Sequence, residues 1–539
     1  MLLQSTLPQP KLYPQHFPTN TNASYSYSLQ FPSGFCNSTN FSTRNHPFCI
    51  TCYVPQIHNY GTMDYENKPP LKWSYYYKRI SLMENPEKGA ASILNQCENE
   101  GKRFTKWELC RVVKELRKFR RFKLALEVYE WMNTRADRFR ISTSDTAIQL
   151  DLISKVQGIS DAEDYFVRLP DSLKDKRVYG ALLNSYVRAK KKKKAESMIS
   201  QMKGRGYASH ALPYNVMMTL YMNFKDYDKV DFMVAEMIER QIPLDIYTYN
   251  IWLSSCGSQG SAEKMEQVFE QMKLDSTINP NWTTFSTMAT MYIKMGQVEK
   301  GEEYLRKVEG RITGRDRMPY HFLISLYGSS GNKEETLRAW NNYKKTFPTI
   351  PNLGYHAIIS SLVRVDDIEM AEKIYEEWLA VKSTYDPRIA NLIMGWYVRN
   401  GNFEKAEEFF QDIVDVAGGK RNPTTWEILG EIYINKKRIS EALSCLQEAT
   451  LVEGSKFWKP KPTNVSSILT LCKQEGDKDS KEVLLGILKN LGCLNDEVYA
   501  SYISKNESGV SDDLPTEKDG ADDVEDNAEV FLNQLQGTL

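Results

Sequence analysis

Acidic residues are missing from the first 63 residues of this 539-residue chain. The same segment is rich in Ser, Thr, Asn, Pro and Tyr, and Lys11 and Arg44 are its only Lys and Arg residues. It also lacks the apolar core of a secretory signal, whereas acid-free, hydroxyl-rich leaders are typical of organelle transit peptides. Residues 1–63 are therefore predicted to be a disordered transit peptide. The scarcity of Arg favours the chloroplast over the mitochondrion, which is the alternative, and an extension without an address is the remaining interpretation.

Long apolar runs and paired cysteines are also missing. No stretch approaches the roughly 18 consecutive apolar residues that a membrane-spanning helix needs, so no membrane association is predicted. The nine cysteines are scattered singly, apart from Cys49 and Cys52, which argues against a disulfide framework. These two residues have the spacing of half a zinc site, but Cys36, His46 and His58 do not complete a familiar zinc module. We predict no metal site.

Motifs of catalysis are absent as well. The chain has no His-x-Glu with a downstream Cys-x-x-Cys, as a zinc deaminase needs, and no Gly-x-x-x-x-Gly-Lys phosphate loop. It has no cluster of Asp residues for the metal of a nuclease. Its carboxylates are spread along predicted helix faces, where they pair with Lys or are solvated. The chain is predicted not to be an enzyme and to use no cofactor.

What the chain does contain is a repeat of about 35 residues. From His210, apolar residues recur at helical spacing as far as Tyr221, charged residues from Phe224 to Asp228 interrupt the pattern, and it then resumes as far as Met237. One unit is therefore predicted to be a pair of antiparallel helices. Matching this unit along the chain gives the starts of units 1 to 11, which are Thr105, Ser142, Asp175, His210, Asp245, Asn281, Asp316, Pro351, Asp386, Asn422 and Lys461.

The regular spacing of these starts indicates the fold class. A lone helix pair cannot bury its apolar face and needs neighbours on both sides. The spacing therefore predicts an all-α fold, an α-solenoid superhelix of about eleven helix-turn-helix repeats over residues 105–495. Residues 64–104, which mix aromatic and basic side chains, are predicted to form an N-terminal cap.

Charge is unevenly placed around the repeats. Residues 505–539 contain ten acidic residues and two Lys, a net charge of −8, so the C-terminal extension 496–539 is predicted to carry a disordered acidic tail. Residues 64–504 hold 65 basic and 59 acidic residues, a net charge of +6. Because this excess is modest, binding of an anionic partner is predicted to depend on where the charges lie.

A cation recurs at the fourteenth residue of six units. These residues are Lys118, Lys155, Arg188, Lys294, Arg364 and Arg399. Each is predicted to lie at the end of the first helix of its unit, where a cation compensates the helix dipole and caps free carbonyls. Stacked units would also align these charges into a row that can follow a phosphate backbone. They are therefore candidate phosphate contacts, and the two roles do not exclude each other.

Short motifs recur at fixed places within the units. Examples are Pro-Tyr-Asn at 213–215, Thr-Tyr-Asn at 248–250, Lys-Met-Gly at 294–296, Arg-Asn-Gly at 399–401 and Asn-Pro-Asn at 279–281. With the 35-residue period, these openings, turns and hinges resemble the pentatricopeptide repeat proteins of plant organelles. The resemblance covers about 105–495, and tetratricopeptide units, which prefer 34 residues, lack the Asn-rich opening. Uniform units resemble the P-type subclass.

The resemblance implies sequence-specific binding of single-stranded organellar RNA, one base to each unit, in support of transcript stabilisation, processing or translation. It implies that the sixth residue of a unit and the first residue of the next read the base, from a groove where amide, hydroxyl and carboxylate groups meet its Watson–Crick edge. RNA-processing or ribosomal proteins are further candidate partners. The implied RNA-binding pairs are Asn215 with Asp245 for uracil, Asn250 with Asn281 for a pyrimidine, Ser286 with Asp316 for guanine, and Asn391 with Asn422 for a pyrimidine.

The other units depart from the code of this family. Their residues at these positions are Gly180 with His210, His321 with Pro351, His356 with Asp386, Glu427 with Lys461, and Cys110 and Ala147 in units 1 and 2. About four of the eleven units therefore have a usable pair. A second hypothesis stays open, a protein-binding or ribosome-assembly scaffold that does not read bases. In that hypothesis His321 and His356, one unit apart, are candidates for a groove with a different ligand.

Overall fold

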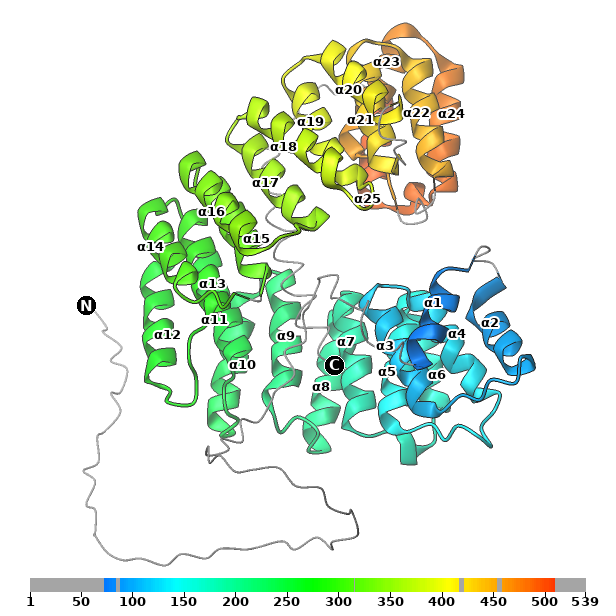
Figure 1. Ribbon diagram of the computed structural model, residues 1–539, viewed down its shortest axis with the longest axis vertical. Coiled ribbons are helices and arrows are strands. Elements are labelled where there is room, and N and C mark those ends of the chain that lie inside the picture. The colour runs from blue at the N-terminus through cyan, green and yellow to red at the C-terminus, as the bar shows by residue number, and fades with distance from the viewer. Residues whose placement is uncertain (1–71, 84–87, 315, 416–420, 453–457, 509–539) are drawn as a thin grey trace, which may run out of the picture. The chain divides into compact units, whose positions relative to one another are not determined.

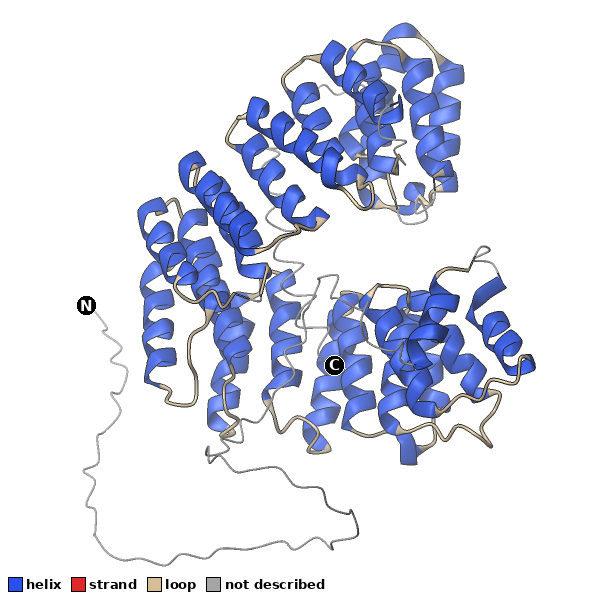
Figure 2. Cartoon of the chain, viewed as in Figure 1, coloured by secondary structure: helices blue, strands red, loops and turns tan. Residues whose placement is uncertain are grey.

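The computed structural model describes residues 72–83, 88–314, 316–415, 421–452 and 458–508, and every regular element within these ranges is a helix (Figure 2). The all-α prediction is therefore confirmed. The predicted transit peptide, with Cys49 and Cys52, lies outside the described residues, as does the acidic tail beyond Ser508.

Eleven consecutive helix pairs follow one another along the chain (Figure 1). The first helices of units 1 to 11 are α3 (Lys106–Lys118), α5 (Thr143–Val156), α7 (Lys176–Arg188), α9 (Ala211–Asn223), α11 (Ile246–Ser258), α13 (Trp282–Lys294), α15 (Met318–Ser329), α17 (Asn352–Arg364), α19 (Pro387–Arg399), α21 (Pro423–Asn435) and α23 (Pro462–Glu475). The second helices are α4 (Phe122–Asn133), α6 (Ile159–Arg168), α8 (Lys192–Gly204), α10 (Tyr227–Glu239), α12 (Ala262–Leu274), α14 (Val298–Glu309), α16 (Lys333–Thr346), α18 (Ile368–Val381), α20 (Phe403–Asp415), α22 (Ile439–Leu451) and α24 (Lys478–Asn490).

The predicted unit starts coincide with the beginnings of the first helices. Ten of the eleven predicted residues are the N-cap of their helix, and the exception is Asp316, which lies one residue before the N-cap Arg317. Thr105 shows why, because its side chain accepts a hydrogen bond from the backbone N–H of Glu108 while the Glu108 carboxylate accepts one from the Thr105 N–H. Such reciprocal caps satisfy backbone donors that the helix leaves free. A side-chain cap of the N-cap residue marks the start of the first helix in seven of the eleven units.

Buried side chains run through the array from unit to unit. First helices pack against the first helices of the next unit, as α5 does on α7 and α15 on α17. One buried apolar cluster extends from Trp73 to Cys445, and a second, from Ile439 to Tyr499, continues it. This is the continuous core that stacked helix pairs need.

Charged and hydroxyl groups also link successive units. Glu196 of α8 accepts a hydrogen bond from the Tyr221 hydroxyl of α9 at 3.3 Å and forms an ion pair with Lys229 of α10 at 2.6 Å. Glu309 of α14 is contacted in the same way by Tyr327 of α15 and Arg338 of α16. A carboxylate on one unit is therefore held by both helices of the next.

Helices also close the two ends of the described array. Helix α1 (Lys72–Ser81) packs against α3 and α2 (Gly89–Asn99) against α4, so the segment before unit 1 is itself a helix pair. Helix α25 (Glu497–Ser508) packs against α23, and its last four residues are the first four of the segment predicted to be disordered. Among the described helices, none is both long and apolar enough to cross a membrane.

The turn between the two helices of a unit has the same unusual backbone in ten units. Its residue with positive φ is Arg120, Lys190, Lys225, Gly260, Gly296, Gly331, Asp366, Gly401, Lys437 or Gly476. In half of these units a residue other than Gly adopts the left-handed conformation, which costs roughly 1–2 kcal/mol for an L-residue with a Cβ. The sequence motif that ends in Gly is thus one solution to a turn that all ten units share.

Replacing Lys225 by Gly is expected to raise the free energy of unfolding by about 1 kcal/mol, because Gly adopts this conformation without a steric penalty. Urea unfolding followed by circular dichroism measures the change. The matched control is Lys373→Gly, an exposed position in the interior of α18, which should lower stability by about the same amount. A Lys225→Gly variant that is less stable than the native chain would contradict the explanation.

Candidate nucleic-acid interface

Two of the four predicted base-reading pairs are in direct contact. The side-chain N–H of Asn215 on α9 donates to Oδ1 of Asp245, the N-cap of α11, at 3.0 Å, and the Thr248 hydroxyl donates to Asn215 Oδ1 at 2.8 Å. The same arrangement joins Asn391 to Asn422 at 3.1 Å, where the Thr425 hydroxyl donates to Asn391. The sixth residue of a unit therefore lies beside the N-cap of the next unit.

The third pair is joined through a hydroxyl group. The side-chain N–H of Asn250 donates to Oγ1 of Thr283 at 3.1 Å, and that hydroxyl donates to Oδ1 of Asn281 at 2.6 Å. In the fourth pair, Asp316 accepts a hydrogen bond from the Met318 backbone N–H, and no hydrogen bond to Ser286 is found within the described residues. Three of the four pairs are thus connected and one is not.

The four polar side chains at the sixth position are nearly buried, with exposed fractions of 1–8% for Asn215, Asn250, Ser286 and Asn391. Within the described part of the chain, Asn250 Oδ1 and Ser286 Oγ have no hydrogen-bond partner. A buried polar atom without a partner costs about 1–3 kcal/mol, which a ligand's donor or acceptor could offset. Units 5 and 6 can therefore accept a polar ligand atom without breaking an existing hydrogen bond at that atom.

Two of the departures from the code are side chains used inside the protein. His321 is buried, and its Nε2 is hydrogen-bonded to the Tyr343 hydroxyl at 2.9 Å. Burial, and then the charge of Arg317, lowers the pKa of His321 to about 3, so the ring is neutral at physiological pH. His321 is buried to the same degree as the four polar side chains at this position, and its Nδ1 has no hydrogen-bond partner within the described residues. The hypothesis that His321 and His356 form a groove for another ligand therefore stays a prediction.

Glu427 is the second such residue. Its carboxylate accepts hydrogen bonds from the backbone N–H of Lys461 and from Nε1 of Trp458, the latter at 3.3 Å. Burial raises the pKa of Glu427 despite these donors. The structure therefore brings Glu427 and Lys461 together, but the contact is made through the Lys461 backbone.

The candidate phosphate contacts divide into two groups. Lys118, Lys294 and Arg399 are exposed, and each is the last residue of its first helix. The other three are half-buried and held by protein groups: Lys155 and Arg188 form ion pairs with Asp151 at 2.9 and 3.1 Å, and Arg364 donates to Ser329 Oγ at 2.8 Å. The predicted position at the helix end is confirmed, and their contact with phosphate stays a prediction.

Asp151 is the centre of a buried charged cluster. Besides Lys155 and Arg188, it contacts Arg117 of the preceding unit at 3.4 Å. Burial alone would raise the pKa of this carboxyl group, but the charges of Lys155 and Arg188 outweigh it and hold the pKa below its usual value. Three cations share one anion here, so the cluster keeps an excess positive charge.

Positive charge is concentrated in the first three units. Residues 105–209 contain 24 basic and 13 acidic residues, a net charge of +11, whereas residues 210–504 contain 34 basic and 40 acidic residues, a net charge of −6. The modest total for the array conceals this asymmetry. Summing charge by unit would have found it from the sequence.

Exposed apolar side chains lie near the openings of four units. Trp107 is 64% exposed, Tyr247 41%, Leu353 40% and Leu212 36%, and each is the third residue of its unit. Exposed aromatic and apolar surfaces beside the polar pairs suit the stacking of bases. The signal that marks them is an apolar residue in the first turn of the helix, repeated in register.

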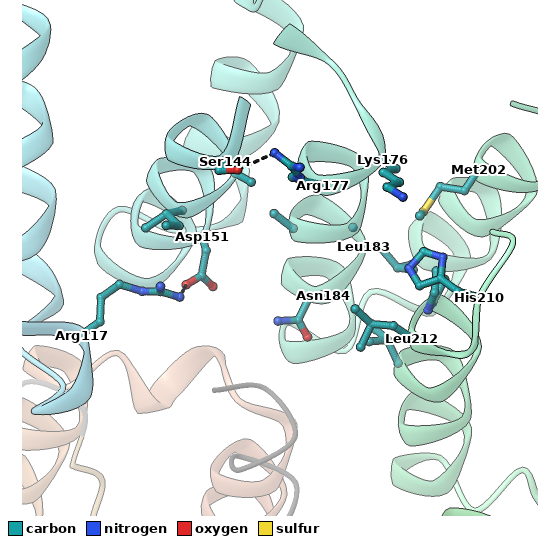
Figure 3. A pocket seen from close by; sticks show the side chains of 16 residues that line it. Arg117, Ser144, Asp151, Lys176, Arg177, Leu183, Asn184, Met202, His210 and Leu212 are labelled. Atoms are coloured by element: carbon teal, nitrogen blue, oxygen red, sulfur yellow. Dashed lines mark hydrogen bonds and ion pairs between the residues drawn. The ribbon is translucent and has the colours of Figure 1, made fainter. Parts of the chain in front are cut away.

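A cavity of about 230 Å³ opens along the first helices of units 2, 3 and 4 (Figure 3). Its lining includes Gly180 and His210, the pair of unit 3 that matches no code, together with Ala147 of unit 2. Arg177 reaches from α7 to α5, where its guanidinium donates to Ser144 Oγ at 2.6 Å. Arg117 and Asp151 of the charged cluster also line the cavity.

Comparison with protein families finds matches along the array. The model described as PPR repeat matches residues 177–207, 213–242, 283–311, 355–380 and 389–415, and the pentatricopeptide repeat domain matches 232–295. A tetratricopeptide repeat model matches 423–454, within unit 10.

Relatives of this chain carry the same family name. A pentatricopeptide repeat-containing protein of Arabidopsis thaliana is 57% identical over all of both chains. Another pentatricopeptide repeat-containing protein of that plant, named mitochondrial, is 31% identical over 86% of this chain and 95% of its own. A large ribosomal subunit protein of the same plant, mL101 (rPPR4), is 35% identical over 77% of this chain and 84% of its own. The pentatricopeptide repeat protein PPR10 in complex with an 18-nt psaJ RNA element matches with a TM-score of 0.44 and 16% identity, over 79% of this chain and 61% of that one.

Proposed function

Because the chain belongs to the pentatricopeptide repeat family, we propose that it binds single-stranded organellar RNA with sequence selectivity, one base to each unit. The observation that carries this proposal is the contact between the sixth residue of a unit and the N-cap of the next, as in Asn215 and Asp245. It sets an amide and a carboxylate side by side, a combination of donors and acceptors that can match a base edge.

The proposed mechanism is occupation of a segment and needs no cofactor. The exposed side chains Trp107, Leu212, Tyr247 and Leu353 offer apolar surfaces for bases, while the neighbouring pairs offer hydrogen bonds. An RNA segment held along the units is kept from exonucleases and from pairing with itself. Bound in this way, the protein stabilises a transcript or supports its processing or translation. The uniform spacing of the units supports assignment to the P-type subclass.

The proposed site of action is an organelle, reached with residues 1–63 as a cleaved transit peptide. The scarcity of Arg in that leader supports the chloroplast, whereas the mitochondrial relative supports the mitochondrion. Fusion of residues 1–63 to a fluorescent protein in plant cells decides between them. Fluorescence in the cytosol would contradict both addresses.

Selection of random single-stranded RNA by the full chain at near-physiological salt is expected to enrich U, a pyrimidine and G in that order, read by units 4, 5 and 6. Asn215→Ala should lose the preference for U and Ser286→Ala the preference for G. Each should weaken binding of the selected RNA up to about tenfold, since one hydrogen bond is worth about 0.5–1.5 kcal/mol.

The matched control is Ser255→Ala, a buried Ser on α11 that is not at a base-reading position. It should leave the enriched sequence unchanged. A pool without an enriched sequence would contradict the base-reading proposal. The same enriched sequence for the native chain and all three variants would also contradict it.

A second candidate function is that of a scaffold in ribosome assembly. The relative named as a large ribosomal subunit protein supports it, as does the use of His321 and Glu427 in internal contacts at base-reading positions. If this is the function, the protein is expected to co-sediment with organellar ribosomal subunits after free RNA has been removed with RNase. It is also expected to select no sequence from a pool of random RNA.

A further inference from the structure

The cavity along α5, α7 and α9 has a simple cause in the sequence. At the sixth position, units 2 and 3 carry Ala147 and Gly180, whereas units 4 to 10 carry Asn, Ser, His or Glu. An added Cβ at Gly180 would meet no atom within 4 Å. The cavity thus lies where units 2 and 3 have small residues at the sixth position.

The size and walls of the cavity limit what can enter it. Its volume of about 230 Å³ is below the range of about 300–1,000 Å³ of small-molecule pockets. A single ring system therefore fits better than a whole cofactor. Apolar groups of Ala147, Ile148, Ala181, Leu212 and Val216 form much of the lining, and Leu212 is exposed at the surface.

Polar groups stand around this apolar space. Its charged and titratable lining residues are Arg117, Asp151, Lys176, Arg177 and His210 (Figure 3). Burial, and then the charge of Lys176, lowers the pKa of His210, so its neutral ring offers one donor and one acceptor. Most of the residues that line the cavity belong to 105–209, the part of the chain with a net charge of +11, which attracts a phosphate backbone.

We propose that the cavity at Gly180 accepts a purine base of the bound RNA, enclosed by shape, with His210 at its polar edge. The larger ring of a purine buries more apolar surface than a pyrimidine in the space that the missing side chains leave. The pair Gly180 and His210 would thus select a purine by the size of the cavity, and not by the hydrogen bonds of an amide side chain. This inference rests on the proposed function and concerns the base immediately 5′ of the one read by Asn215 and Asp245.

The test measures the affinity of the full chain for four RNAs that carry the selected sequence and differ only at that base. A and G are expected to bind about tenfold more tightly than C and U, since base stacking is worth about 1–3 kcal/mol. Gly180→Leu fills the cavity and should remove most of this difference. Gly180 lies inside α7 without close neighbours, so the substitution favours the helix.

The matched control is Gly486→Leu on α24, another helical glycine without neighbours within 4 Å and outside the cavity. It should keep the purine preference. If Gly180→Leu lowers the melting temperature, Gly180→Ala, which adds a single methyl group, replaces it and should reduce the preference partly.

The outcomes separate the two proposals. Equal affinity for all four bases, or tighter binding of C and U, overturns the cavity proposal. The proposed function still stands in that case if U, a pyrimidine and G are enriched at units 4 to 6. A purine preference that survives Gly180→Leu also overturns it. Loss of selectivity at every position overturns the proposed function and the cavity proposal together.

Discussion

Asp151→Ala is expected to lower the free energy of unfolding of the N-terminal units by about 3–5 kcal/mol, the cost of removing one partner from a buried ion cluster. The carboxylate is buried and contacts Arg117, Lys155 and Arg188, which come from three successive first helices. Without it, three cations would repel one another in a partly buried site. The loss should therefore separate units 1 to 3.

Hydrogen exchange resolves this effect by unit, which a single unfolding curve does not, because stability in repeat arrays is a sum over units and their interfaces. Protection should fall in α3, α5 and α7 and stay unchanged in α19 and α21. The control Asp164→Ala removes an exposed carboxylate 3.9 Å from Arg168 and should cost well under about 1 kcal/mol. Equal effects of the two substitutions would contradict the role of the cluster.

The same cluster predicts a dependence on pH. The pKa of Asp151 is lowered in the folded protein, so the folded state binds this proton less readily than the unfolded state. Its stabilisation is present above the ordinary Asp pKa of about 3.9 and is lost as the pH falls through the lower folded-state pKa. In Asp151→Ala that part of the acid sensitivity should be missing.

Substitution of Lys114, Lys118 and Lys176 together by Gln is expected to weaken RNA binding about a hundredfold at 0.1 M salt and to lower the slope of log K against log salt by about 2, because each phosphate contact on a single strand contributes about 0.7. All three side chains are exposed on first helices of units 1 and 3. Lys176 also lines the cavity. Fluorescence anisotropy over a range of salt concentrations gives both values.

The matched control replaces Lys345, Lys373 and Lys489, which are exposed on the second helices α16, α18 and α24. It removes the same charge and should leave the slope almost unchanged. If both triple variants lose the same affinity for RNA, the net charge of the protein determines binding. The position of the cations in units 1 to 3 would then have no effect of its own.

What the sequence predicts well is set by neighbouring residues. Thr105, Ser142 and Asp245 mark helix starts because their side chains cap backbone groups three residues away. Repetition then extends one unit to all eleven. The register of the base-reading pairs follows, so Asn215 lies beside Asp245 as predicted.

What the sequence predicts poorly depends on contacts between different helices. His321 and Asn215 occupy the same position of their units, but His321 is hydrogen-bonded to Tyr343 on the second helix of its own unit. The ion cluster at Asp151 needs side chains from three helices, and the cavity at Gly180 is a property of absent atoms. The contacts of His321 and Asp151 leave no periodic signal in the sequence, whereas the small residues at the sixth position of units 2 and 3 do mark the place of the cavity.

The charge asymmetry between residues 105–209 and residues 210–504 also has a consequence for kinetics. A cationic surface speeds the diffusional encounter with an anionic strand, and salt suppresses this acceleration. Under the proposed function, hydrogen-bonding pairs such as Asn215 with Asp245 and Asn391 with Asn422 act after contact and govern how long the strand stays. We therefore expect an RNA to arrive at the amino-terminal units irrespective of its sequence and to be retained or released by the units that follow.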